Sequence, residues 1–368
     1  MIEMKLMIVE DAESDLEVCR SSIEIFKNRK KDKGIDLIIT LVECKTVDDA
    51  LKIIDGSFDG AIIDLRFSDN YNKGKDVLQK INDSLFRIPV VILTGTPDSI
   101  NEEDRSSLIN VLKKGEADYQ EDILNVFFEI YNTGLTQIVG GRGKIEQTLN
   151  KVFLKNLLPQ LEVWKDYGKS NPLGTEKALL RFTLNHLMHL LDDDEEKSFP
   201  EEVYIYPPLS DSLKTGSIIK KKEAEDLYVI LNPACDLVIR SNNQFKTDRI
   251  MLVQIENIKS IIDAALDGIT NKQKKENKLK DLFANNYTNY FHWLPYTKFF
   301  SGGFLNFRKV STITKEELES NYDQPQIQIS LHFVKDILSR FSSYYARQGQ
   351  PDIEYSKVIE EIITSSGD

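Results

Sequence analysis

The chain has 368 residues, of which 41% are hydrophobic and 29% are charged. Such a composition is typical of a soluble globular protein, and the length suffices for two or three domains with cores of their own. The formal net charge of −12 excludes a protein that coats nucleic acid by general attraction, because neutralising phosphates needs a surplus of Lys and Arg, although a local basic patch remains compatible with it.

Four short apolar segments in the first 115 residues are predicted to be buried strands of a parallel sheet. They are residues 5–9, 59–66, 89–93 and 110–112. Helical patterns at 14–28 and 47–54, with a strand at 36–43 between them, continue the alternation through Tyr131. We therefore expect an α/β domain with a doubly wound parallel sheet of the flavodoxin-like kind.

Polar residues end each of these four strands. They are Glu10, Asp11, Asp64, Thr94 and Lys113. The carboxyl ends of parallel strands meet at one edge of the sheet, so these side chains are predicted to lie together. Clustered carboxylates favour a hard cation such as Mg²⁺, and a hydroxyl and an ammonium opposite it would stabilise a phosphoryl group. The set suits phosphorylation of an aspartate.

Residues 4 to about 131 resemble the receiver domain of two-component response regulators. The resemblance implies that Glu10 and Asp11, with Asp64, hold Mg²⁺ and that Asp64 accepts a phosphoryl group from a histidine kinase. It also implies that Thr94 is the switch hydroxyl and Lys113 the phosphoryl-binding lysine.

The chain departs from this family at three places. Lys114 follows the assigned lysine at a position where proline is usual, so the phosphoryl-binding lysine is either Lys113 or its neighbour Lys114. Asn110 stands near the place of the aromatic switch residue, and the loop 67–74 is longer than usual. These departures favour an altered read-out of phosphorylation.

Residues 134–200 are predicted to be a linker and a helical connector. The glycine-rich segment 134–144 lacks the spacing of a phosphate-binding loop, because Ile138 and Ile145 stand where glycine and a hydroxyl residue are needed. Helical patterns follow at 144–167 and 175–191. His186 and His189 lie one turn apart on the second, which suits a metal site, but their apolar neighbours favour packing.

Residues 201–368 are predicted to form an α+β module with a small antiparallel β-barrel. The expected strands are 203–206, 216–220, 228–231, 249–255, 290–294 and 303–310. A lysine-rich helical insertion at 258–285 interrupts them, and a helix at 330–348 follows. This half loosely resembles uncharacterised modules of bacterial conflict and phage-defence proteins, which implies a place in antiphage defence.

Cys235 and Asp236 follow an apolar strand and a Pro turn. A nucleophile or ligand site is one interpretation, with His292 in the same module, and a nucleic-acid-acting enzyme is the activity it would suggest. The other interpretation, a buried cysteine with Asp236 capping the backbone, is the one we favour.

The three cysteines are scattered, which predicts neither a zinc site nor disulfides. No apolar run approaches the roughly 18 residues of a membrane span, and no leader precedes the first strand, so we expect a cytoplasmic protein. We predict a response regulator with domains at 1–133, 134–200 and 201–368, in which phosphorylation gates an effector or partner-binding module. A scaffold that never accepts phosphate is the alternative.

Overall fold

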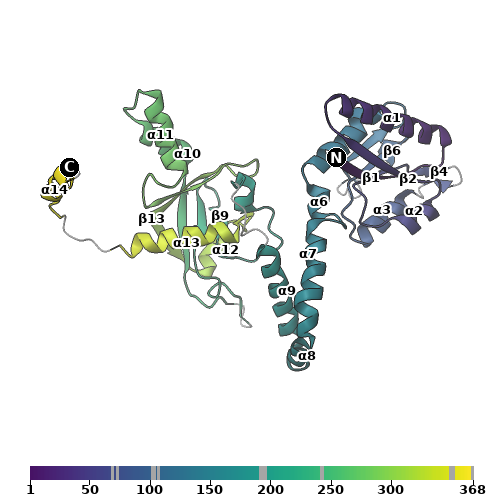
Figure 1. Cartoon of the computed structure of the whole chain (residues 1–368). Coiled ribbons are helices and arrows are strands. Elements are labelled where there is room, and N and C mark those ends of the chain that lie inside the picture. Colours follow the sequence, from purple (N-terminus) through teal and green to yellow (C-terminus); the bar gives the residue numbers. More distant parts are fainter. Residues whose placement is uncertain are drawn as a thin grey trace. The chain divides into compact units, whose positions relative to one another are not determined.

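The structure is a computed structural model that describes residues 1–67, 70–71, 74–100, 105, 108–189, 197–240, 244–347 and 353–365. The chain divides into two compact units, Met1–Asp194 and Glu195–Asp368 (Figure 1). Within the described residues, no helix is long and apolar enough to cross a membrane.

The first unit contains five parallel strands in the order β2-β1-β3-β6-β7. Their bounds are β1 Ile2–Val9, β2 Leu37–Cys44, β3 Gly60–Ile63, β6 Val90–Thr94 and β7 Asn110–Lys113. The helices that cover the sheet are α1 Glu13–Asp32, α2 Val47–Ile53, α3 Gly74–Asp83 and α5 Asn125–Asn132. This strand order defines the flavodoxin-like doubly wound fold, as predicted.

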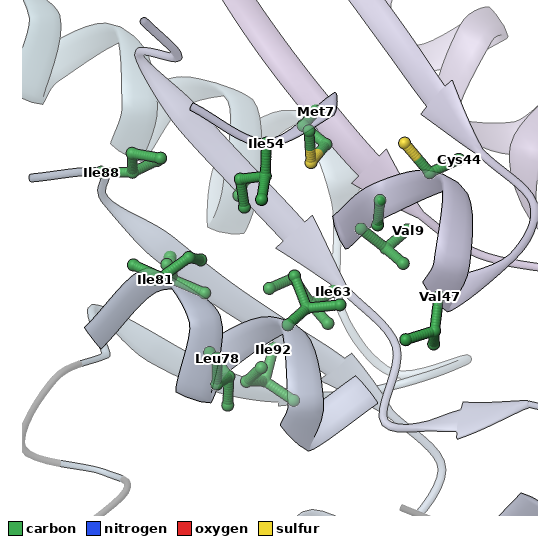
Figure 2. Packing of buried hydrophobic residues seen from close by; sticks show 14 of the residues in the cluster. Met7, Val9, Cys44, Val47, Ile54, Ile63, Leu78, Ile81, Ile88 and Ile92 are labelled. Atoms are coloured by element: carbon green, nitrogen blue, oxygen red, sulfur yellow. The ribbon is translucent and has the colours of Figure 1, made fainter. Parts of the chain in front are cut away.

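Each face of the sheet has its own apolar core, because successive side chains of a strand point to opposite faces. The α2/α3 cluster, shown in part in Figure 2, includes Met7, Val9, Ile63 and Ile92. The α1/α5 cluster includes the residues between them, such as Ile8 and Ile62. Both faces are therefore covered, which explains why the central strands β3 and β6 are almost entirely apolar.

The glycine-rich segment 134–143 packs on the first unit. The Gly141 amide donates to the Gly56 carbonyl at 2.7 Å, and a Cβ at Gly141 would lie 2.5 Å from that oxygen. Arg142 pairs with Asp59 at 3.3 Å, and Arg87 contacts the Val139 carbonyl. Instead of the expected open linker, the segment joins the sheet to helix α7 (Lys144–Val152) through specific contacts.

The predicted helix at 144–167 is interrupted near Pro159. Helix α7 gives way to a π-helical turn at Phe153–Leu157 and a 3₁₀ turn at Leu158–Gln160 before α8 (Leu161–Ser170) begins. Proline has no N–H to donate and its ring clashes with the preceding turn, which accounts for the break. Asn171 then caps α9 (Pro172–Met188), accepting from the Gly174 amide at 3.0 Å.

The second unit contains a seven-stranded antiparallel sheet in the order β12-β13-β11-β10-β9-β14-β8. The bounds are β8 Tyr204–Ile205, β9 Ser217–Lys220, β10 Leu227–Ile230, β11 Ile250–Glu256, β12 Phe291–Leu294, β13 Gly303–Ile313 and β14 Ile327–Ile329. The sheet curls: the Tyr204 hydroxyl on one edge strand donates to the Pro295 carbonyl, just beyond the other edge strand, at 2.8 Å. The predicted α+β module is confirmed.

Helices cover both faces of the curled sheet (Figure 1). Helices α10 (Ile258–Leu266) and α11 (Lys272–Phe283) form the predicted insertion, and α13 (Leu331–Tyr345) packs on the main core through Val334 and Ile337. Sequence patterns did not predict β14 or the short helices α12 (Lys315–Asn321) and α14 (Ser356–Ser365).

Candidate functional site

Side-chain alternation decides which polar residues meet at the carboxyl end of the parallel sheet. Ile8 of β1 and Ile62 of β3 belong to the α1/α5 cluster, and Leu112 of β7 packs against it. Two residues further along, each strand is followed by a polar residue. Since the strand period is two residues, the polar residues on this face are Glu10, Asp64 and Lys114. They come from three strands and converge at one point.

The Lys114 ammonium is the centre of this cluster. Its Nζ lies 2.5 Å from Glu10 Oε2, 2.8 Å from Asp64 Oδ2 and 2.7 Å from Asp15 Oδ2 near the start of α1. Glu10 and Asp64 are almost fully buried, with 2% and 5% of their surface exposed. Three carboxylates and one ammonium leave a net negative charge at a site where Glu10 and Asp64 are shielded from water and Lys114 and Asp15 are partly exposed.

Lys113, the residue predicted to bind the phosphoryl group, does not belong to this cluster. Its side chain is half exposed and pairs with Glu116. Val111 packs with the α2/α3 cluster and Leu112 with the α1/α5 cluster, so Lys113 and Lys114 continue on opposite faces. The alternation of Val111 and Leu112 in the sequence was the signal that could have identified Lys114.

Backbone amides hold the two buried carboxylates in place. Glu10 Oε1 accepts from the Ala12 amide and Asp64 Oδ1 from the Arg66 amide, each at 3.1 Å. Gly74, the first residue of α3, packs so closely that a Cβ there would lie 2.2 Å from the Asp64 carbonyl oxygen. The carboxylates therefore have fixed positions rather than free rotation in solvent.

Thr94 ends the neighbouring strand β6 and is completely buried. Its hydroxyl accepts from the Thr96 amide at 3.5 Å, a long contact. Asp11 is half-buried and lies next to Glu10 in the chain. Across the described parts of the chain, no group of three or more His, Cys, Asp and Glu side chains is arranged to hold a metal ion.

Burial and hydrogen bonding shift the pKa values of the cluster. Desolvation raises the pKa of Glu10 above its ordinary value, although hydrogen bonds from Lys114 and from the Ala12 amide act in the opposite direction. Burial alone would lower the pKa of Lys114, but its hydrogen bonds to Asp15, Asp64 and Glu10 outweigh burial and raise it. Lys114 is therefore a permanent cation at neutral pH.

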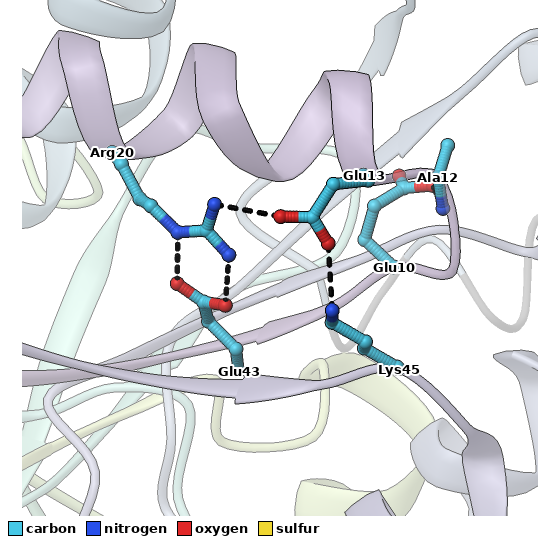
Figure 3. Close-up of polar contacts among 6 residues, drawn as sticks. All are labelled: Glu10, Ala12, Glu13, Arg20, Glu43 and Lys45. Atoms are coloured by element: carbon cyan, nitrogen blue, oxygen red, sulfur yellow. Dashed lines mark hydrogen bonds and ion pairs between the residues drawn. The ribbon is translucent and has the colours of Figure 1, made fainter.

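A second polar network fixes the N-terminal part of α1 (Figure 3). Asp15 lies in the first turn of this helix. Arg20 binds both carboxylate oxygens of Glu43, at 2.7 and 2.5 Å, and Glu13 at 2.8 Å. Lys45 reaches Glu13 at 2.6 Å. The hydrogen bond from Arg20 holds the pKa of Glu43 below its usual range. This network joins α1 to the end of β2 beside the carboxylate cluster.

The loop after Asp64 contains a short hairpin of β4 (Arg66–Phe67) and β5 (Asn70–Tyr71). The remainder of the expected long loop, residues 68–69 and 72–73, lies outside the described residues. Asn110, near the expected place of an aromatic switch, is exposed at the start of edge strand β7.

The histidines and the cysteine singled out by the sequence have other surroundings. His186 Nδ1 lies 2.8 Å from the Phe182 carbonyl oxygen in the same helix, and the centroids of the two rings are 4.4 Å apart. Cys235 is exposed, so the favoured interpretation of a buried cysteine is wrong; its Sγ contacts Asp236 Oδ1 at 3.7 Å. His292 is buried and lies 3.7 Å from Asp336 of α13.

Part of this chain is similar in fold to solved structures of other proteins. No protein-family profile matches the chain, and no curated protein matches it. A response regulator receiver domain from Clostridium thermocellum is 18% identical, with a TM-score of 0.29, and the match covers 37% of this chain and 99% of that one.

Two further receiver domains match a similar share. A response regulator from Thermotoga maritima, solved with Mg²⁺ and beryllium fluoride, is 15% identical over 33% of this chain and 96% of that one, with a TM-score of 0.25. The receiver domain of a sensor histidine kinase from Pseudomonas aeruginosa, with magnesium in its active-site cleft, is 15% identical over 34% and 96%, with a TM-score of 0.25. These matches cover the N-terminal third of this chain.

Proposed function

We propose that the first unit is the receiver domain of a response regulator and that Asp64 accepts the phosphoryl group. The observation that carries this proposal is the convergence of Glu10, Asp64 and Lys114 at the carboxyl end of a parallel sheet. The site lies at the carboxyl ends of β1 and β3, between which the strand order β2-β1-β3-β6-β7 reverses direction. Doubly wound sheets bind ligands at this switch point.

The residues divide the chemistry between them. A carboxylate oxygen of Asp64 attacks the phosphorus of the donor, an acyl phosphate forms, and the leaving group departs with the electrons of the broken bond. The Lys114 ammonium, 2.8 Å from Asp64, stabilises negative charge on the phosphoryl oxygens. The buried Thr94 hydroxyl donates to one of those oxygens once Asp64 is modified.

The chemistry of the donor set at this site suits Mg²⁺, although the described side chains are not arranged around an ion. Glu10 and Asp64 offer hard oxygen ligands, and the cluster holds more carboxylates than cations, so a divalent cation would balance its charge. Glu10, Asp64 and the adjacent Asp11 are the residues that would hold the ion. Bound there, Mg²⁺ would supply charge neutralisation for the incoming phosphoryl group.

A histidine kinase is the proposed phosphoryl donor, and residues 201–368 the output module, with residues 1–133 as receiver and 134–200 as connector. Phosphorylation would gate a partner-binding or effector role of that module. A role in antiphage defence rests on the loose resemblance of the C-terminal half, and a comparison of phage plaque counts with and without the gene tests it.

The labelling of Asp64 tests the proposal. Protein incubated with Mg²⁺ and acetyl phosphate should gain one phosphoryl group, detected by intact-protein mass, and Asp64→Asn should gain none. Asp59→Asn is the matched control, because Asp59 is equally buried but precedes β3 at the other end of the sheet. Equal labelling of Asp64→Asn and wild type would refute the assignment.

One observation favours a scaffold that never accepts phosphate. The Lys114 ammonium already bonds Glu10, Asp15 and Asp64 together, so these side chains are held in a folded cluster without phosphate. The same labelling experiment separates the two functions, since a scaffold would give no mass increase from wild type and no dependence on Mg²⁺.

A further inference from the structure

A groove of about 580 Å³ with mostly apolar walls lies on the second unit. It is lined by strands β8 and β14, helix α13 and residues 212–215, 233–234 and 237–239. Four of its apolar side chains are between 40% and 58% exposed: Ile205, Val238, Ile239 and Leu331. An exposed apolar surface of this kind usually marks a binding site.

Helix α14 is an amphipathic helix near the C-terminal end of the chain. Its apolar residues, Val358, Ile359, Ile362 and Ile363, form one stripe, and its polar residues occupy the opposite face. None of its residues is buried. An isolated ten-residue helix is marginal in water, so the stripe needs an apolar partner for the helix to persist.

We propose that α14 binds in this groove of its own chain, with the apolar stripe facing Val238, Ile239 and Leu331. This intramolecular contact goes beyond the phosphoryl chemistry of the first unit and does not depend on it. The occupant of the groove is thus an amphipathic helix that the chain itself supplies, in the manner of helix-in-groove recognition.

The chain between α13 and α14 is long enough for this contact. Residues 346–355 separate the two helices and can span up to roughly 33 Å when extended. The groove residues of α13 begin at Leu331, and Tyr345 at the end of that helix lies about 21 Å from it along the axis. Helix α14 can therefore turn back and lie antiparallel to α13.

Charge complementarity favours the same occupant. Lys214 and Lys335 line the groove, whereas Glu360 and Glu361 stand on the polar face of α14, beside the stripe. Oppositely charged rims mainly set the orientation of a helix that apolar contacts hold. The groove and α14 thus both have an apolar surface, and the charged residues beside these surfaces have opposite signs.

Hydrogen exchange measured by mass spectrometry on the full chain tests this contact. Amides of residues 358–365 should exchange about tenfold or more slowly than those of a free peptide of the same sequence, since docking must open before exchange. Val238→Asp in the groove and Ile362→Asp in the stripe should each raise the rate to that of the peptide. Both sites are exposed, so the fold should tolerate the charge.

Two matched controls introduce an aspartate at positions outside the proposed contact. Leu209→Asp lies in the second unit at a fully exposed position outside the groove lining, and Lys357→Asp lies in the middle of the polar face of α14. Both should keep the slow exchange. Peptide-like exchange in wild type, or unchanged protection in Val238→Asp, would overturn the proposal. Protection that rises with protein concentration together with a dimer mass would also overturn it, because the groove would then hold α14 of a second copy.

Discussion

Lys114 bonds to three carboxylates that would otherwise repel one another in a buried place. Its side chain follows the end of β7 on the face of the sheet that also carries Glu10 and Asp64, so the backbone position and the charge both place the ammonium beside these carboxylates. Removing this cation leaves two buried carboxylates without their partner, which is usually more costly than losing the attraction itself.

Lys114→Met and Lys113→Met should therefore differ in two measurements. Lys114→Met should lose most of the labelling of Asp64 by acetyl phosphate and should lower the melting temperature of the first unit. Lys113→Met should change neither, because Lys113 pairs with Glu116 at the surface. If Lys113→Met lost the labelling of Asp64 and Lys114→Met kept it, Lys113 would be the phosphoryl-binding lysine.

At the scale of elements, the contact between residues 56 and 141 joins the glycine-rich segment to the first sheet. The two backbones approach so closely that Gly141 has no room for a side chain: a Cβ there would lie 2.5 Å from the Gly56 oxygen. A Cβ at Gly56 would lie 3.3 Å from the Gly141 Cα, which is a tight contact. Glycine is needed here for space, since neither position has a positive φ.

Gly141→Ala should destabilise the first unit by about 1–3 kcal/mol, because the added methyl group forces the two backbones apart. Gly168→Ala is the matched control inside α8, where a Cβ meets nothing within 4 Å. That change should stabilise the helix by roughly 0.5–1 kcal/mol. Urea unfolding measures both, and an equal effect of the two substitutions would contradict the close contact.

At the scale of the whole molecule, the two units should respond differently to acid, because His292 is buried in the second. Burial, and to a lesser degree the charge of Arg340, lowers the pKa of His292 from 6.5 to about 3. Between these values the unfolded chain binds a proton that the folded unit does not. The contribution of His292 to stability is therefore complete above pH 6.5 and is lost as the pH falls toward 3.

The melting temperature of the second unit should fall across this pH range, with a slope in the free energy of unfolding of up to about 1.4 kcal/mol per pH unit from this residue. His292→Asn should flatten that dependence. His332→Asn, at an exposed position of α13, should leave it unchanged. A pH profile that is the same in wild type and His292→Asn would show that the histidine is not buried as a neutral group.

The sequence by itself determined the flavodoxin-like fold of the first unit. Its apolar strands, each followed by a polar residue, alternate with amphipathic helices, and both are local patterns that a buried parallel sheet imposes on any chain. The same local patterns predicted the insertion and the strands of the second unit except β14. Glu10, Asp64 and Thr94 were candidate site residues because they end strands.

Tertiary structure decided what local pattern could not express. The choice of Lys114 over Lys113 depends on which face of an edge strand meets Glu10 and Asp64. The glycine-rich segment looked like a linker, because sequence shows flexibility but not the Gly56 backbone that fills the space beside it. Cys235 looked buried among apolar neighbours, yet its exposure depends on where a turn projects from a sheet. Each of these depends on residues far apart in the chain, and only folding brings them together.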